Sequence, residues 1–390
     1  MAYDTDDIIE KRRRRHRQHT FRNILIFLLL ACFCVFLYLQ RDAWIPKLEG
    51  IGSRYETVTQ NDGELAEGNF PLTISNASGY QAAIVSDTLF LLHDAYLDVY
   101  SIHGDTEDSR QHAFQNESMC AADGKYVLVY EREGSSFRVD TKSKNVYSKT
   151  VDEDIISGVI SSSGSVALIT ESSSYACSIV VYDNTGKRIY QRDCTERVID
   201  IAFHDDDEGC YFTMIDAESG VIQSTVHSIL FEQVDIQWTG LPLETLVVKS
   251  GVTSDNTLCI IGNSACAYYN NGGALLSSYT YTGTLVSASV ENGKAALLIA
   301  DDQQREISLI LMNGSANDPT IVSVDTSASY LTVTDGDAIV MSDDNITSYS
   351  FSGTAIATVA LDGSYDSFLK QDGYVLLLGY NQIDRVDFKE

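Results

Sequence analysis

The sequence repeats a β-rich unit of about forty residues, and this repeat limits the possible folds more than any other feature. Each unit opens with a small or acidic turn and enters an apolar strand. Most units then cross a polar turn into a strand that carries Tyr, Val or Ile. The first and last opening turns are 372 − 87 = 285 residues apart over seven intervals, a mean spacing of about 41. The opening turns are marked by Asp87, Asp123, Ser163, Asp207, Asp255, Asn292, Asp335 and Asp372.

A period near forty in an all-β chain is typical of a β-propeller, in which each blade is a sheet of four strands. Helical repeats of similar length would show a 3.6-residue periodicity, which these units lack. Eight opening turns predict eight blades, and seven blades is the alternative because the unit from Asp207 to Asp255 is irregular. In that unit we expect "RVIDIAF" to be the innermost strand, followed by "GCYFTMI", "VIQSTVHSIL" and "FEQVDIQW".

The last unit has room for only about three strands before Glu390. The segment "FPLTI", residues 70–74, precedes the first full unit and is available as the missing strand. Closing the ring in this way would join the two ends of the repeat region and leave no free sheet edge.

A membrane anchor is predicted near the N-terminus. The segment "ILIFLLLACFCVFLYL", from Ile24 to Leu39, contains no charged residue. As a helix it measures about 24 Å, slightly less than the roughly 30 Å of a bilayer core, and Arg22 and Arg41 can snorkel to the two interfaces. A cleaved signal peptide is the alternative, but no A-x-A-like site follows the segment, which favours an uncleaved anchor.

A basic cluster precedes the anchor and predicts its direction. The positive-inside bias places this cluster in the cytoplasm and the long C-terminal part outside the cell membrane. The same cluster can bind anionic lipid headgroups. Its members are Lys11, Arg12, Arg13, Arg14, Arg15 and Arg17. The predicted organisation is a cytoplasmic tail (1–20), a transmembrane helix (21–41), a stalk (42–69) with room for a helix or an extra strand, and a propeller (70–390).

The charge distribution is strongly asymmetric. The whole chain has a formal net charge of −28. The first 41 residues hold eight basic and four acidic side chains, a net +4, so the remainder carries −28 − 4 = −32. Such an acidic body repels nucleic acid, which we therefore exclude as a partner, and it should resist self-association.

Two hairpins place cysteines at both of their open ends. If the turn of the first is Thr185–Gly186, paired residue numbers sum to 371, which sets Cys177 opposite Cys194. If the turn of the second is Gly262–Asn263, pairs sum to 525, which sets Cys259 opposite Cys266. Both pairs are candidate disulfides outside the cytoplasm, and buried free thiols are the alternative.

No motif predicts a reaction or a ligand. The sequence lacks the signatures of serine hydrolases, zinc proteases, P-loops and dinucleotide-binding folds, so it predicts no catalytic residue, metal site or cofactor. Whether the protein is an enzyme stays open. The densest acidic run, "HDDDEG" from His204 to Gly209, lacks the ligand spacing of an EF-hand loop, and we interpret it as a solvated turn.

The basic cluster "KRRRRHR", the single anchor and the divergent β-repeat region resemble an uncharacterised group of membrane-anchored propeller-like proteins, common in anaerobic Gram-positive bacteria. The resemblance rests on this layout and covers the whole chain. It implies an eight-bladed, quinoprotein-like propeller on the outer membrane face with no established activity. The tryptophan-docking repeats of quinoprotein dehydrogenases are absent, because Trp44 and Trp238 are the only tryptophans.

The sequence therefore favours a non-catalytic interaction scaffold or sensor at the cell surface, with a protein or cell-envelope partner. The alternative is a glycan-binding or enzymatic propeller that uses its central channel, which requires acidic and aromatic side chains to converge at one end of that channel. Signalling across the membrane is a third possibility, and it needs a further partner because the cytoplasmic tail is too short for a catalytic domain.

Overall fold

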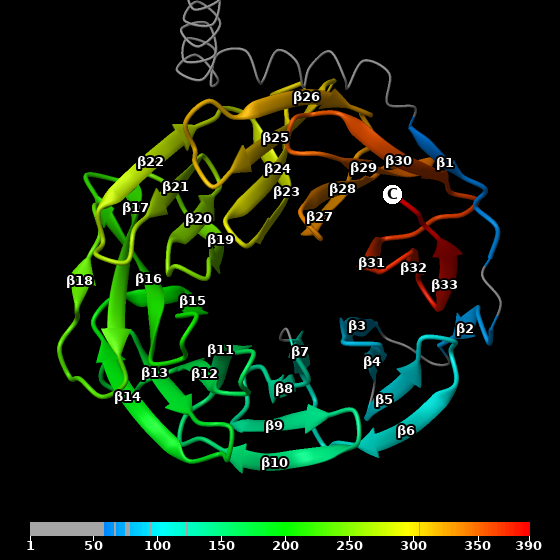
Figure 1. Ribbon diagram of the computed structural model, residues 1–390. Helices are drawn as coiled ribbons and strands as arrows, with labels where there is room; N and C mark the ends of the chain where they lie inside the picture. The colour runs from blue at the N-terminus through cyan, green and yellow to red at the C-terminus, as the bar shows by residue number, and fades with distance from the viewer. Residues whose placement is uncertain (1–57, 66–67, 75–78, 94, 122–123, 304) are drawn as a thin grey trace, which may run out of the picture. The chain divides into compact units, whose positions relative to one another are not determined.

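Eight small sheets stand around a ring in the computed structural model of the protein (Figure 1). The structure describes residues 58–390 except 66–67, 75–78, 94, 122–123 and 304. The predicted anchor from Ile24 to Leu39 and its basic cluster lie outside the described residues. Within the described ranges, no helix has the length and apolar character needed to cross a membrane.

The first four blades follow one another along the chain, each running from the innermost to the outermost strand. Blade 1 comprises β3 (Tyr80–Val85), β4 (Thr88–His93), β5 (Tyr96–Ser101) and β6 (Thr106–Gln111). Blade 2 comprises β7 (Glu117–Ala121), β8 (Val127–Glu131), β9 (Ser136–Thr141) and β10 (Lys144–Thr150). Blade 3 comprises β11 (Ile155–Ile160), β12 (Val166–Thr170), β13 (Cys177–Tyr182) and β14 (Arg188–Cys194). Blade 4 comprises β15 (Arg197–Phe203), β16 (Gly209–Glu218), β17 (Val221–Leu230) and β18 (Trp238–Thr239).

The second four blades complete the ring. Blade 5 comprises β19 (Val247–Val252), β20 (Leu258–Gly262), β21 (Ala265–Tyr269) and β22 (Leu275–Thr280). Blade 6 comprises β23 (Thr284–Glu291), β24 (Lys294–Ala300), β25 (Ile307–Asn313) and β26 (Thr320–Val324). Blade 7 comprises β27 (Tyr330–Thr334), β28 (Asp337–Met341), β29 (Asn345–Tyr349), β30 (Ala355–Ala360) and an outer β1 (Thr59–Asn61). Blade 8 comprises β31 (Ser367–Gln371), β32 (Tyr374–Leu378), β33 (Gln382–Asp387) and β2 (Leu72–Thr73).

The ring confirms the eight-bladed propeller. The opening turns join the first and second strands of the blades, and four of them are two-residue turns. In Asn292–Gly293 and Asp335–Gly336 both residues have positive φ, which the common two-residue hairpin turn requires.

One strand assignment was wrong: most of "FEQVDIQW" is a loop, and only Trp238–Thr239 pairs with β17. The backbone of this loop bonds to turns instead, as when Phe231 N–H donates to Glu208 O at 2.9 Å.

The two ends of the repeat region meet in blade 8, as predicted. Within the "FPLTI" segment, Leu72 pairs with Ile383 and Thr73 with Gln382, so β2 supplies the fourth strand. The extra strand β1 lies within the range assigned to the stalk and pairs in parallel with β30. The ring is thus closed by hydrogen bonds between strands far apart in sequence, which leaves β33 with a partner on both sides.

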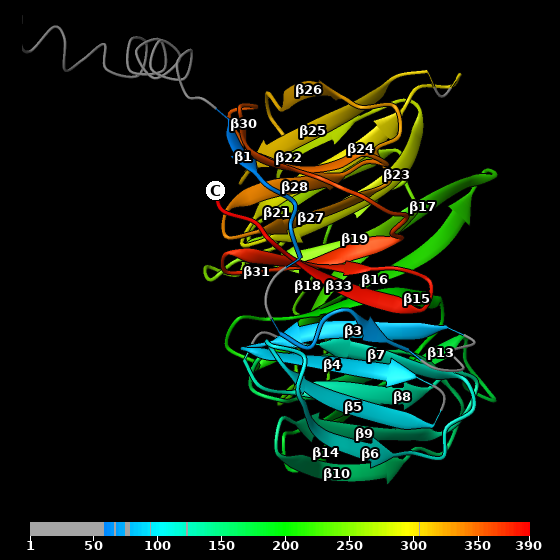
Figure 2. The same cartoon turned by 90° about the vertical axis from the view of Figure 1, so that its right-hand side faces the viewer.

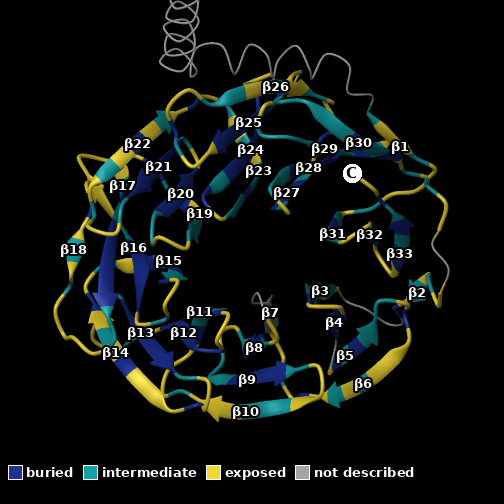
Figure 3. Cartoon of the chain, in the orientation of Figure 1, coloured by how far each residue is buried: buried dark blue, intermediate teal, exposed yellow. Residues whose placement is uncertain are grey.

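The core lies between the blades, where the second and third strands of each blade are covered on both faces. All residues of β12 and β13 are buried, because each of these strands contacts both neighbouring blades. The outer strands alternate between buried and exposed positions, as in β14. Figure 3 shows the difference as dark blue strands within the blades and yellow segments at the outer rim. Strands covered on both faces need continuous apolar runs, which explains the pattern in the sequence.

The antiparallel order of each blade defines two faces of the ring. The starts of the first strands and the links between second and third strands lie on one face, which we call the hairpin face because the β16–β17 hairpin projects from it (Figure 2). The turns between first and second strands lie on the opposite face. Because β1 is parallel to β30 and Thr59 pairs with Ala357 near the start of β30, the described chain begins at the opposite face.

Candidate functional site

The β16–β17 hairpin is the most prominent feature of the hairpin face. Arg197, the first residue of β15, pairs with Ile215, and Ser224 of β17 forms a bridge with Leu243. Beyond Ile215 and Ser224, the hairpin continues with the pairs from Asp216–Gln223 to Glu218–Val221. Among the described residues, no third strand lies beside these pairs. The tip therefore extends about 10 Å past its sheet, and neither of its edges pairs with a further strand among the described residues.

The base of this hairpin is fixed and its tip is exposed. Ser224 is buried, donates to Thr245 O at 2.7 Å and accepts from Val247 N at 3.3 Å. At the tip, Val221 is 43% exposed and Ile222 is 49% exposed. Exposed aliphatic residues on a two-stranded ribbon with unpaired edges are suited to receive a strand or an apolar side chain from another protein.

The channel mouth on the same face carries four β-bulges in consecutive blades. The pairing of the innermost strand with the next skips one residue in blades 3 to 6 and runs without a shift in blades 1, 2, 7 and 8. The skipped residues are Ile156, Ile199, Val248 and Val286. Val248 and Val286 are exposed, whereas Ile156 and Ile199 pack against the clusters between blades.

The innermost strand of blade 4 carries one buried carboxylate. Asp200 of β15 accepts a hydrogen bond from the Ser250 hydroxyl, and burial raises the pKa of its carboxyl. In the part of the chain that the structure describes, no group of three or more His, Cys, Asp or Glu side chains is arranged to hold a metal ion. The "HDDDEG" segment is a turn, in which His204 is buried against Tyr211 and Asp205 and Asp206 are exposed.

Acidic and aromatic side chains do meet where blades 8 and 1 join. The Tyr80 hydroxyl donates to Gly379 O at 2.7 Å, and the Tyr365 hydroxyl donates to Asp384 Oδ2 at 2.8 Å. Gln382 Nε2 also donates to both oxygens of Asp384, which is buried. The Tyr80–Gly379 bond ties the two ends of the repeat region together, whereas the bonds to Asp384 lie within the last unit.

The predicted pairing of Cys177 with Cys194 is confirmed, although for a different reason. The hairpin loop has three residues rather than two, because Asp183 N–H donates to Lys187 O and Gly186 N–H donates to Asp183 O. A bulge at Ile189 then restores the predicted register.

The two cysteine sulfurs are not joined in the structure, and the disulfide stays a prediction. The hydrogen bond between the two thiols lowers the pKa of Cys177 to about 7 and raises that of Cys194. The thiolate form of Cys177 is therefore the more accessible of the two.

The register predicted for the second cysteine hairpin is wrong. Cys259 pairs with Tyr268 and Cys266 with Ile261, so pairs sum to 527 and the turn is Asn263–Ser264. The two cysteines are therefore diagonal to each other instead of opposite. Both are free thiols buried in an apolar cluster between blades 5 and 6, and burial raises the pKa of each to about 12.

The sequence reasoning missed the projecting hairpin, although a signal was present. The unit from Asp207 to Asp255 is 48 residues long, and its extra length was interpreted as an irregularity that cast doubt on the blade count. The extra residues lengthen β16 and β17 to ten residues each. An unusually long unit in a propeller repeat thus marked an extended hairpin.

The sequence matches the profile of a family described as a family of unknown function, DUF5711, over residues 73–388. The chain belongs to this family. The match covers all eight blades and agrees with the resemblance to an uncharacterised propeller group. No curated protein matches the sequence.

Solved structures show the same architecture at low identity. BamB from Moraxella catarrhalis has a TM-score of 0.55 and 11% identity, covering 83% of this chain and 100% of that chain. Sqt1 from Saccharomyces cerevisiae has a TM-score of 0.56 and 12% identity, covering 85% and 99%. The C-terminal WD40 domain of Sif2 has a TM-score of 0.60 and 10% identity, covering 83% and 100%. Such identities establish the fold alone, including the expected quinoprotein-like neighbour.

Proposed function

We propose that this protein is an interaction scaffold anchored on the outer side of a cell membrane and that its hairpin face binds a protein partner. The observation that carries the proposal is the β16–β17 tip, which holds Val221 and Ile222 in solvent beyond its sheet. The similarity to a WD40 domain and to BamB supports an interaction role, because propellers present loops and hairpins to other proteins.

The charge of the hairpin face indicates the chemistry of the partner. Acidic side chains outnumber basic ones in the loops on this face. Three runs contribute several acids each: Asp152, Glu153 and Asp154; Asp301 and Asp302; Asp343 and Asp344. A basic partner surface with an extended segment complements both these loops and the unpaired hairpin edges.

The direction of β1 keeps the start of the propeller away from the proposed partner site. The described chain begins at the face opposite the hairpin, next to the start of β30.

Site-specific photocrosslinking in the full-length protein tests the partner site. A photoreactive residue at Ile222 should capture a discrete basic protein in intact cells, and the yield should fall as ionic strength rises. Ile321 is the matched control, because it is 56% exposed on the outer strand β26, away from the hairpin. Equal capture from both positions, or no capture from Ile222, would refute the proposed site.

Protease treatment of intact cells tests the location. We expect external protease to cut the propeller while an N-terminal tag stays protected inside the cell. Full protection of the propeller until the membrane is permeabilised would contradict an exterior location.

A further inference from the structure

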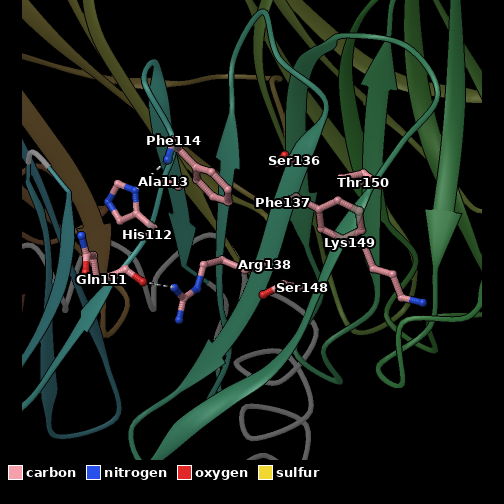
Figure 4. Close-up of a pocket in the computed structure, with 10 residues that line it drawn as sticks. All are labelled: Gln111, His112, Ala113, Phe114, Ser136, Phe137, Arg138, Ser148, Lys149 and Thr150. Atoms are coloured by element: carbon pink, nitrogen blue, oxygen red, sulfur yellow. Dashed lines mark hydrogen bonds between the residues drawn. The ribbon is translucent and has the colours of Figure 1, made fainter.

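A cleft of about 530 Å³ lies between blades 1 and 2, outside the channel and the projecting hairpin (Figure 4). One wall is the segment that links the two blades, with His112 and Phe114. The other wall belongs to the outer hairpin of blade 2, where Arg138 lies on β9 and Ser148 on β10. The volume is within the range of sites that bind small molecules.

Strand alternation explains the polar wall. Ser148 pairs with Arg138 across β9–β10, and Thr150 pairs with Ser136. Paired residues share one side of a sheet, so all four side chains face blade 1. Lys149 lines the cleft as well, but its side chain extends toward Gly186 of blade 3. The wall therefore presents three hydroxyls and one guanidinium.

The guanidinium of Arg138 is buried and rigidly held, with 7% of the residue exposed. Its Nε and Nη2 donate to Asp140 at 2.5 and 2.7 Å, and its Nη1 donates to Gln111 O at 3.1 Å. These bonds use three of its five N–H groups. One N–H on each terminal nitrogen has no partner among the described residues, at the edge of the cleft.

The carboxylates that balance the two guanidinium groups do not line the cleft. Asp140 is fully buried and is shared by Arg138 and Arg110, because Arg110 Nη1 also donates to it at 3.1 Å. Asp108, the second carboxylate on Arg110, has a side chain that is 41% exposed. The charged residues that line the cleft, Arg138 and Lys149, are both basic.

We propose that this cleft binds an acidic saccharide, a sugar ring that carries a carboxylate. The carboxylate takes the two remaining N–H groups of Arg138, because a guanidinium fork matches a carboxylate in geometry. The hydroxyls of Ser136, Ser148 and Thr150 both donate and accept, as ring hydroxyls require. The half-buried ring of Phe114 supplies an apolar surface for one face of the sugar.

Ligand-observed NMR on the detergent-solubilised full-length protein tests the proposal with three probes. D-glucuronate should give saturation transfer, while D-glucose and cyclohexanecarboxylate should bind at least about tenfold more weakly, the loss expected for charge-assisted hydrogen bonds. If glucose binds as tightly as glucuronate, the cleft does not recognise the charge of the carboxylate. If cyclohexanecarboxylate binds as tightly as glucuronate, the cleft does not recognise the sugar hydroxyls. The absence of saturation transfer to all three probes would overturn the site.

A pair of variants with the same charge change locates the binding. Ser148→Asp is an exposed change that places a carboxylate opposite Arg138 and should reduce glucuronate binding at least about tenfold. Lys187→Gln changes the net charge by the same amount in an exposed turn of blade 3, outside the cleft, and should leave binding unchanged. Equal losses from both variants would mean a general charge effect and overturn the site. Arg138→Lys should also weaken binding, with circular dichroism to confirm that the variant folds.

Discussion

Two interfaces between neighbouring blades bury side chains of different chemistry. Between blades 3 and 4 the buried contacts are mostly apolar and include Cys177, Cys210 and Phe212, whereas the Arg197–Glu171 ion pair across this interface is exposed. Between blades 1 and 2 the inner strands also pack apolar residues, but the outer strands meet through the Arg110–Asp140 ion pair and the hydrogen bond from Arg138 to Gln111 O. The charged part of that interface borders the 530 Å³ cleft.

The contrast shows how the same blade geometry can be filled in two ways. Apolar contacts are not directional, so packing fills the interior of the blade 3–4 interface, and polar contacts such as the one from Ser161 to Asp207 lie at its margin. Hydrogen bonds of a buried guanidinium are directional, so the blade 1–2 interface holds its strands at fixed distances and leaves space beside them. We therefore expect the charged interface to be the more sensitive to a single substitution.

The largest effect is expected from Asp140→Ala. This change leaves the buried guanidinium of Arg138 without its carboxylate and should lower the free energy of unfolding by about 3–5 kcal/mol. Urea titration followed by circular dichroism measures the loss. Asp108→Ala is the control, since its carboxylate is 41% exposed where it binds Arg110 Nε and Ser109 N–H, and its loss should cost about 1 kcal/mol or less. Similar losses for both variants would show that burial does not govern this network.

The next effect concerns the blade 3–4 interface. If Cys177 and Cys194 are oxidised in the exterior medium, the bond closes a hairpin segment of 18 residues. Reduction should then lower the free energy of unfolding by about 3 kcal/mol. Peptide mapping of protein exported by cells should find the two cysteines joined, and Cys177→Ser should abolish the response to reductant. Free thiols in exported protein would refute the disulfide.

A smaller effect at the same interface depends on pH. His227 is buried against Phe212, its Nδ1 contacts Thr239 Oγ1 at 2.9 Å, and burial lowers its pKa to about 4. The contribution of His227 to stability is complete above the unfolded-state pKa near 6.5 and is lost as pH falls from about 6.5 to about 4. Between these two pH values the imidazole takes up a proton in the unfolded chain but not in the folded one, which favours unfolding.

Across this window we expect the free energy of unfolding to fall by about 2 kcal/mol from this residue. Denaturant titrations at pH 7 and pH 4 measure the change. His227→Phe should remove most of this slope, whereas the same substitution at the exposed His103 should not. A slope that His227→Phe leaves unchanged would exclude His227 as its source.

The repeat and its closure could be predicted because each follows from local residues. A turn such as Asp335–Gly336 requires positive φ at both positions, and few sequences other than Asn-Gly or Asp-Gly provide it. The "FPLTI" strand could be placed because the last unit lacks a strand. The number of blades follows from these turns, which are visible in the sequence without any long-range contact.

Register and interblade chemistry could not be predicted in the same way. The bulge at Ile189 and the Asn263–Ser264 turn shift a ladder by one or two residues, and nothing in the adjacent residues distinguishes these outcomes. The cleft depends on Arg110 reaching Asp140 across a blade boundary, 30 positions along the chain. Such contacts are set by how two blades pack, not by the sequence of either one.

The smallest effect on stability is expected at the projecting hairpin, which belongs to neither interface. Ile222→Ser should change the free energy of unfolding by about 0.5 kcal/mol or less, because the side chain lies beyond the last three-stranded level of blade 4. Capture of the partner by a crosslinker at the neighbouring Val221 should nevertheless be lost, while Ile321→Ser should leave it intact. A large destabilisation by Ile222→Ser would instead mean that the tip packs against the ring, and the hairpin would then be part of the core.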